Sequence, residues 1–187
     1  ARHVASDGKR EHQKFTNTNV KLSGFFRSGN NLEWNAGIGM EQDRTYKYGY
    51  EPQTLVFNPD SIKQNFQTIA GRLAFHNINK TEFGLTYSPE VKIDVFSDNH
   101  DNSESNTVVN LPLQKTIGKE IIVNLGITFD LTRVSPKSKS AINNTMYYIS
   151  PSVLYKTSNI NVQAGIRPSW DNKTFKMFPN ILADISS

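Results

Sequence analysis

Long runs of strict alternation between apolar and polar residues constrain this chain more than any other feature of its sequence. From Glu82 to Phe96, alternate positions beginning at Phe83 are apolar or aromatic up to Val95, and none of the intervening residues is. Similar runs cover 32–40, 121–132, 147–156 and 175–185, with few exceptions such as Ile122. A period of two residues indicates β-strands, and helical spacing explains none of these runs.

The length of the runs favours strands that cross a membrane. Strands of soluble proteins usually have about 5–6 residues, whereas a tilted strand that spans a bilayer needs about 9–11. Most runs here are of the second size, so we predict an all-β fold, an antiparallel transmembrane β-barrel section of about nine strands. The expected strands are 15–27, 32–42, 66–77, 81–96, 107–117, 120–133, 147–156, 160–168 and 175–186.

The gaps between these segments alternate in length. Short gaps lie at 29–31, 78–80, 118–119 and 157–159, longer polar gaps lie at 43–65, 97–106 and 134–146, and the gap at 169–174 is intermediate in length. Outer-membrane barrels have short periplasmic turns and long extracellular loops. We therefore treat 1–187 as one partial barrel domain, with 1–14 as an extracellular loop that leads into the first strand.

Aromatic residues gather next to both kinds of gap. Membrane proteins carry aromatic belts at the two membrane–water interfaces, and such belts account for two groups of residues. Near the short turns lie Phe26, Trp34, Phe75, Phe83 and Tyr155, and near the long loops lie Tyr46, Tyr48, Tyr50, Tyr147, Trp170 and Phe175.

The alternation assigns residues to two faces. We expect lipid to contact Phe83, Leu85, Tyr87, Val91, Ile93, Ile121, Val123, Leu125, Ile127 and Phe129. We expect the lumen to be lined by residues that include Arg72, Glu82, Glu90, Lys92, Asp94, Asp130 and Arg167. Lys21, Lys156 and Lys176 bring the predicted inward-facing cations to six, and Glu33 and Asp184 bring the inward-facing acids to six. Because the two numbers are equal, we expect no charge filter.

A soluble β-sandwich or lipocalin-like barrel is the main alternative fold, because one face of its sheet would be core and the other would meet water. Long strands, unequal loops and aromatic residues at both strand ends argue against it. No apolar run approaches the roughly 18–20 residues of a membrane helix. Proline is poorly tolerated in central strands, and five prolines lie inside or at the ends of the predicted strands: Pro89, Pro112, Pro151, Pro168 and Pro179.

No catalytic, cofactor or metal site is predicted. The chain has no cysteine, and it lacks the G-x-S-x-G, H-E-x-x-H and phosphate-loop motifs. One segment is rich in side-chain oxygens and holds Asp98, Asn99, Asp101, Asn102 and Glu104. Calcium binds such ligands, but the segment lacks the EF-hand spacing. We therefore interpret it as a solvated loop. The histidines are scattered at His3, His12, His76 and His100. The net charge is +4, but the lysines and arginines are scattered and do not form the stripe typical of nucleic-acid binding. Anionic lipopolysaccharide would be an equally suitable partner for them.

Several segments resemble the barrel portion of TonB-dependent receptors and receptor-like outer-membrane proteins of Bacteroidetes-type bacteria. They are GLTYSPEVKIDVFSD (84–98), VNLPLQKTIGKEIIVNLGITFDLT (109–132), YISPSVLYKT (148–157), AGIRPSWDN (164–172) and FKMFPNILADI (175–185). The resemblance implies a large barrel of about 20 or more strands, an N-terminal plug and import driven by a periplasmic energy-coupling protein. We expect the chain to be a section of such a protein.

The leading hypothesis is therefore a receptor or transporter of the bacterial outer membrane that takes up a nutrient or ligand without bond chemistry. The alternative is a non-transporting barrel subunit that scaffolds an outer-membrane lipoprotein or protein-assembly complex. Expected partners are outer-membrane lipid and lipopolysaccharide, together with a plug, a coupling protein or a surface lipoprotein. The sequence names no ligand.

Overall fold

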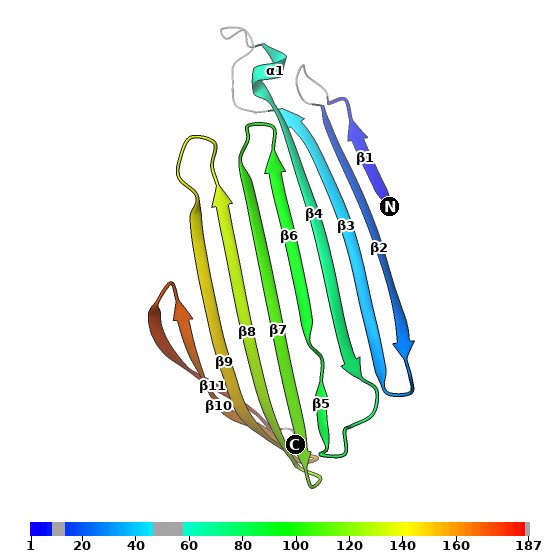
Figure 1. The fold of residues 1–187 in the computed structure, drawn as a ribbon, viewed down its shortest axis with the longest axis vertical. Coiled ribbons are helices and arrows are strands. Elements are labelled where there is room, and N and C mark those ends of the chain that lie inside the picture. Colours follow the sequence, from blue (N-terminus) through cyan, green and yellow to red (C-terminus); the bar gives the residue numbers. More distant parts are fainter. Residues whose placement is uncertain (9–13, 47–57, 186–187) are drawn as a thin grey trace.

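The computed structural model describes residues 1–8, 14–46 and 58–185, which form one antiparallel sheet of eleven strands (Figure 1). A one-turn helix, α1 (Pro59–Ile62), precedes β4. The strands are β1 (Arg2–Ser6), β2 (Phe15–Ser28), β3 (Leu32–Tyr46), β4 (Lys63–Asn77), β5 (Leu85–Tyr87), β6 (Glu90–Asp98), β7 (Ser103–Ile117), β8 (Ile121–Ser135), β9 (Ile142–Lys156), β10 (Ile160–Asp171) and β11 (Thr174–Ile185).

Each strand pairs with its neighbour along the chain, in the order β1-β2-β3-β4-β6-β7-β8-β9-β10-β11, and only β5 lies off this path. The all-β antiparallel class is therefore confirmed. The sheet is not closed: β1 and β11 are its two edges, and Figure 1 shows the β10–β11 hairpin turning behind the plane of the other strands.

The strands are staggered in one direction across the sheet. One row of directly paired residues runs through Gly24, Ala36, Leu73, Val91, Val109, Phe129, Tyr147, Trp170 and Phe175. On β2 the row lies four residues from Ser28, at the short-turn end of the strand. On β11 it lies ten residues from Ile185, at the same end of the sheet. A stagger that accumulates with one sign is the geometry of tilted strands in a barrel wall.

Several predicted boundaries were wrong in the same direction. Residues 2–6 were placed in a loop but form β1, which pairs with β2. Strands β7, β9 and β10 extend further toward the long-loop end than predicted, so the gaps there shrink to 99–102, 136–141 and 172–173. The pairing continues there through Ser, Thr and Asn residues, which carry no apolar alternation but still form ladder hydrogen bonds. The long polar gap 43–65 is shortened at both ends, and residues 47–57 lie outside the described part of the chain.

The predicted strand 81–96 is divided, which together with β1 raises the count from nine to eleven. Glu82 and Phe83 lie in a turn, and Gly84 follows them with φ of +72°. Pro89, which has no N–H to donate, interrupts the run between β5 and β6. Here β4 does not pair with β5 through its backbone; the buried side chain of Asn77 joins them instead.

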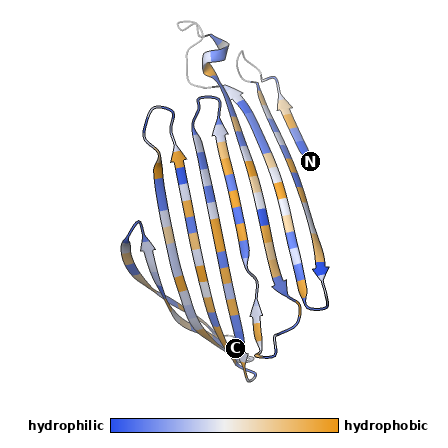
Figure 2. Cartoon of the chain, viewed as in Figure 1, coloured by the Kyte–Doolittle hydropathy of each residue, from blue (hydrophilic) through white to orange (hydrophobic). Residues whose placement is uncertain are grey.

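The two faces of the sheet differ in hydropathy, as the orange and blue stripes along single strands show (Figure 2). We call the face that carries Trp34, Leu125 and Ile181 the apolar face, and the opposite face the polar face. Among the described residues, Ile62 is the only buried apolar residue, and Leu22, Ile181 and Ile185 expose 71%, 72% and 75% of their surface. The described sheet is a single layer without the packed second sheet of a β-sandwich. No helix within the described residues is long and apolar enough to cross a membrane.

Candidate functional site

The strand register sorts the predicted residues onto opposite faces, because successive side chains of a strand point to opposite sides. Leu85, Tyr87, Val91, Ile93, Ile121, Val123, Leu125, Ile127 and Phe129 lie on the apolar face. Arg72, Glu90, Lys92, Asp94, Asp130 and Arg167 lie on the polar face. Glu82 and Phe83 were assigned to faces of a strand but lie in the turn before β5. Which medium each face meets remains a prediction.

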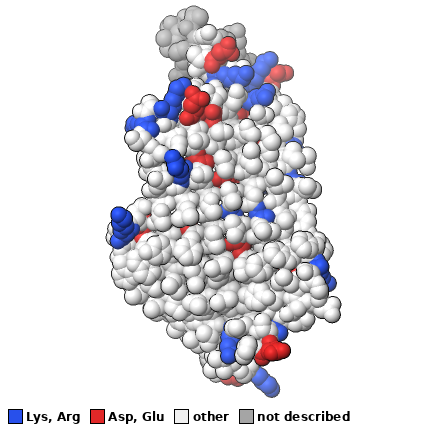
Figure 3. Space-filling view, in the orientation of Figure 1, with Lys and Arg blue, Asp and Glu red and all other residues white. Residues whose placement is uncertain are grey.

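Negatively charged side chains of the described strands are confined to one face of the sheet. All ten carboxylates within the described strands lie on the polar face: Glu33, Glu41, Asp43, Glu90, Asp94, Asp98, Glu104, Asp130, Asp171 and Asp184. The apolar face carries four cations near strand ends: Arg44, Lys63, Lys115 and Arg133. In Figure 3, charged atoms gather toward the two ends of the strands and few lie on the band between them.

Two aromatic clusters lie toward opposite ends of the apolar face. At the short-turn end, Trp34 stacks on Phe26 with ring centroids 6.0 Å apart and contacts Phe75 at 4.7 Å. Toward the other end, Trp170 contacts Tyr147 and Phe175, each at 5.1 Å. The members of each cluster are direct cross-strand partners, the arrangement in which aromatic pairs stabilise a sheet.

The polar face carries two groups of ion pairs, one near its centre and one beside the short turn at 29–31. The Arg72 guanidinium of β4 donates to a carboxylate oxygen of Glu90, and the Lys92 ammonium lies 2.8 Å from the other oxygen. Arg27 pairs in the same way with Glu33, with 3.0 Å between nitrogen and oxygen, and His76 lies 3.8 Å from that carboxylate. Glu90 and Glu33 are thus each paired with cations, whereas the charge balance of a lumen stays a prediction.

Amides and hydroxyls extend this network on either side. Asn106 donates to Asp130 at 2.7 Å and to the Thr132 hydroxyl at 2.8 Å. The Thr128 hydroxyl donates to the side-chain carbonyl of Asn110 at 2.9 Å. The network joins neighbouring strands and fixes the orientation of their polar side chains. Scattered apolar residues, among them Phe25, Phe178 and Leu182, share this face.

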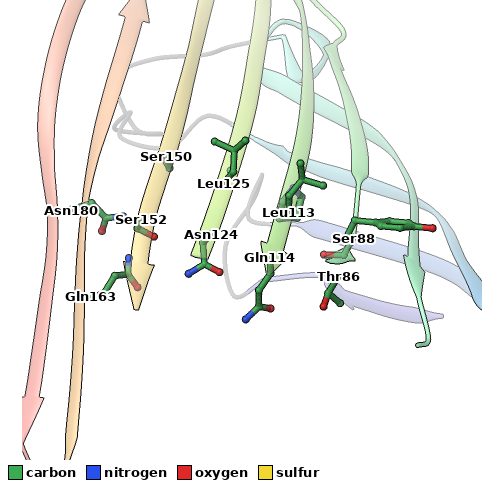
Figure 4. Close-up of a pocket in the computed structure, with 13 residues that line it drawn as sticks. Thr86, Ser88, Leu113, Gln114, Asn124, Leu125, Ser150, Ser152, Gln163 and Asn180 are labelled. Carbon is green, nitrogen blue, oxygen red and sulfur yellow. The ribbon is translucent and has the colours of Figure 1, made fainter. Parts of the chain in front are cut away.

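Near the short-turn end, an uncharged row crosses the polar face of six strands. Directly paired residues form it: Thr86, Gln114, Asn124, Ser152, Gly165 and Asn180. All six line or adjoin a hollow of about 340 Å³, whose lining includes Ser150 and Gln163. In Figure 4, the side chains of Leu113 and Leu125 point away from those of Gln114 and Asn124. The amides and hydroxyls of the row can donate and accept hydrogen bonds without attracting either sign of charge.

Glycine is required at position 165 by the close approach of β9 and β10. A Cβ atom there would lie 2.4 Å from the carbonyl oxygen of Pro151 and 2.6 Å from the Cβ of Ser152. Ser152 and Ser169 are 7% exposed, so the backbones of β9 and β10 approach closely where the sheet turns. Sequence reasoning had singled out the charged lumen residues and missed this neutral row, since alternation gives the face of each residue but not its partner on the next strand.

The oxygen-rich segment forms a turn whose side chains bond within the turn and to neighbouring segments. Asp98 accepts hydrogen bonds from the backbone N–H groups of His100 and Asn102 and from the Asn102 amide, all at 2.8–2.9 Å. Burial of the carboxyl raises its pKa, but these hydrogen bonds outweigh burial and hold the pKa of Asp98 below its ordinary value of 3.8. Asp101 pairs with Lys137 at 2.8 Å, and the hydrogen bond raises the pKa of that ammonium. The Asp98 and Asp101 oxygens are therefore used by the turn and by Lys137.

The described histidines do not converge. His3 lies 2.9 Å from the Thr18 hydroxyl, His76 lies beside Glu33, and His100 sits in the 99–102 turn; His12 is outside the described residues. In the described ranges, no group of three or more histidine or carboxylate side chains is placed to hold a metal ion.

Comparisons with known proteins add no family. No protein-family model matches this chain. No curated protein matches it either.

Proposed function

We propose that this chain forms part of the wall of a bacterial outer-membrane β-barrel, with the apolar face against lipid and the polar face lining the lumen. One observation carries the proposal: every carboxylate of the described strands lies on the face opposite the apolar stripe. If water covered both faces of the sheet, carboxylates could lie on either face. If lipid covered one face, carboxylates would be excluded from it, because charges on a lipid-facing strand are costly near the bilayer centre.

The dimensions of the apolar stripe support the same medium. On β8 it runs from Ile121 to Leu131, a length of about 34 Å at 3.4 Å per residue. Tilted by about 40°, this segment would cover about 26 Å of membrane thickness, close to the roughly 25 Å apolar band of outer-membrane barrels. The two aromatic clusters would then lie toward the two interfaces.

We further propose that the barrel is a receptor or transporter for a polar ligand. The polar face offers compensated charges near its centre and the neutral Gln114–Asn124 row toward one end. Such a surface supplies hydrogen bonds to a passing solute, or to a plug that fills the lumen, without trapping ions of one sign. No observation favours the scaffold alternative over this reading.

Single-cysteine labelling tests the facing directly, because the chain has no cysteine of its own. In protein refolded into vesicles, Asn124→Cys should react with a water-soluble maleimide, and the adjacent Leu125→Cys should react far more slowly. A polarity-sensitive dye on Leu125→Cys should report a hydrocarbon environment. Equal reactivity of the two positions in the inserted protein would refute the assignment of lipid to the apolar face.

Transport is tested separately. Gly126 lines the hollow on the polar face, and its added Cβ would meet only the Ser150 Cβ at 3.7 Å. Gly126→Arg should therefore leave folding intact and slow the entry of neutral sugars into proteoliposomes. Wild-type protein that inserts but admits no solute above the protein-free background would refute transport and leave the barrel assignment standing.

A further inference from the structure

A second hollow lies at the long-loop end of the apolar face. It has a volume of about 180 Å³, and its lining includes Lys14, Thr16, Arg44, Tyr46 and Lys63. Thr16 is the direct cross-strand partner of Arg44, and Tyr46 is the partner of Lys63. Arg44 and Lys63 are diagonal neighbours on adjacent strands, about 7–8 Å apart between their Cα atoms. Three cationic residues, Lys14, Arg44 and Lys63, thus line one space.

The charges of this hollow are weakly compensated by the described residues. Lys14 pairs with Asp7 at 3.4 Å, and both side chains are exposed. The described residues offer Arg44 a long contact of 3.5 Å to the Gln42 amide oxygen, and no carboxylate within ion-pair distance of Arg44 or Lys63. The strand carboxylates, Asp43 included, point to the other side of the sheet.

The hollow also lies just beyond the apolar stripe. The last large apolar residues of β2 and β3 on this face are Val20 and Met40, which are direct partners. Arg44 is four residues further along β3, a distance of about 13 Å along the strand. A ligand held here would have its anionic group at the height of the membrane interface and could have its chains against the stripe.

We propose that this hollow is a binding site for the phosphorylated headgroup of an outer-leaflet glycolipid such as lipid A. The inference rests on the proposed membrane orientation of the apolar face. Arginine and lysine form charge-assisted hydrogen bonds to phosphate, and the guanidinium of Arg44 can bind two phosphate oxygens at once. Thr16 also lines the hollow, and its hydroxyl can donate a further hydrogen bond to the anion. A free anion would satisfy the same charges, but only a lipid would also use the adjoining apolar surface.

The test uses the folded protein in detergent and measures bound lipid by native mass spectrometry. Diphosphoryl lipid A should bind the wild type, and dephosphorylated lipid A should bind at least about tenfold more weakly. The double variant Arg44→Gln/Lys63→Gln should lose a similar factor. Lys137→Gln/Lys139→Gln removes two cations from the same end of the sheet, outside the hollow, and should bind as the wild type does.

A charge-retaining pair, Arg44→Lys/Lys63→Arg, separates loss of charge from loss of folding and should keep most of the binding. Unchanged affinity of the folded Gln variant, or equal affinity for the dephosphorylated lipid, would overturn the site. Displacement of the lipid by inorganic phosphate at equal concentration would overturn the lipid as its ligand. Failure of the wild type to insert into vesicles would instead refute the membrane orientation, and the site with it.

Discussion

The side-chain carbonyl of Asn77 accepts a hydrogen bond from the backbone N–H of Tyr87 at 2.8 Å. The amide of the same side chain donates to the carbonyl oxygens of Leu85 and Asn79 at 2.9 and 2.7 Å. Asn77 is 3% exposed. It takes the place of a backbone ladder between β4 and β5, so the irregular turn at 78–84 keeps its buried polar groups paired.

Asn77→Ala should lower the free energy of unfolding by about 2–3 kcal/mol, because it leaves the Tyr87 N–H without its acceptor and removes one of two hydrogen bonds to the Leu85 carbonyl, which keeps that from the Thr81 N–H. Denaturant unfolding in vesicles measures the change. Asn79→Ala is the matched control, since the Asn79 side chain makes one long contact of 3.5 Å, to the Asn30 carbonyl. Comparable losses from the two variants would show that the Asn77 bridge does not hold β5 in place.

Leu125→Arg and Gly126→Arg place the same side chain on opposite faces of one strand. Leu125 lies on the apolar face, so its replacement should cost about 2–4 kcal/mol near the middle of a bilayer. Gly126→Arg should cost less, because its side chain enters the hollow on the polar face. Refolding yields in lipid vesicles compare them, and equal damage would contradict the assignment of the two faces.

Gly165→Ala should destabilise the sheet by about 1–3 kcal/mol, because the new Cβ would overlap backbone atoms of β9 that cannot move independently. Gly24→Ala is the control: nothing lies within 4 Å of its added Cβ. That variant should be neutral or more stable by a few tenths of a kcal/mol. Thermal stability of the two proteins in the same detergent would decide, and a tolerated Gly165→Ala would show that β9 and β10 can separate.

The turn after β6 should loosen in acid. The pKa of Asp98 is lowered in the fold, so its contribution is complete above the ordinary value of 3.8 and is lost as the pH falls through the lowered pKa. Asp98 lies three residues beyond Val95, outside the apolar stripe. Hydrogen exchange at the His100 and Asn102 amides should accelerate relative to the strand amides below about pH 3.8. Asp98→Asn should make this relative rate nearly independent of pH, and an unchanged pH dependence in that variant would assign the effect to another group.

The alternation in the sequence determined the all-β class and the face of each strand residue. It did so because the side-chain period of a strand is two and does not depend on the partner strand. The alternation also located the apolar stripe of Ile121 to Phe129 without any knowledge of the register. It failed where the stripe ends, as at Ser103 and Ser105, because pairing continues there while the apolar signal stops.

Only the tertiary structure decided which residues meet across strands. Register placed Thr86 beside Gln114, gathered the cations of the second hollow, and showed that Asn77 rather than a ladder joins β4 to β5. These relations join residues far apart in sequence, and their geometry depends on the stagger of whole strands. A local pattern carries no information about stagger, so the faces were predictable while the sites on them were not.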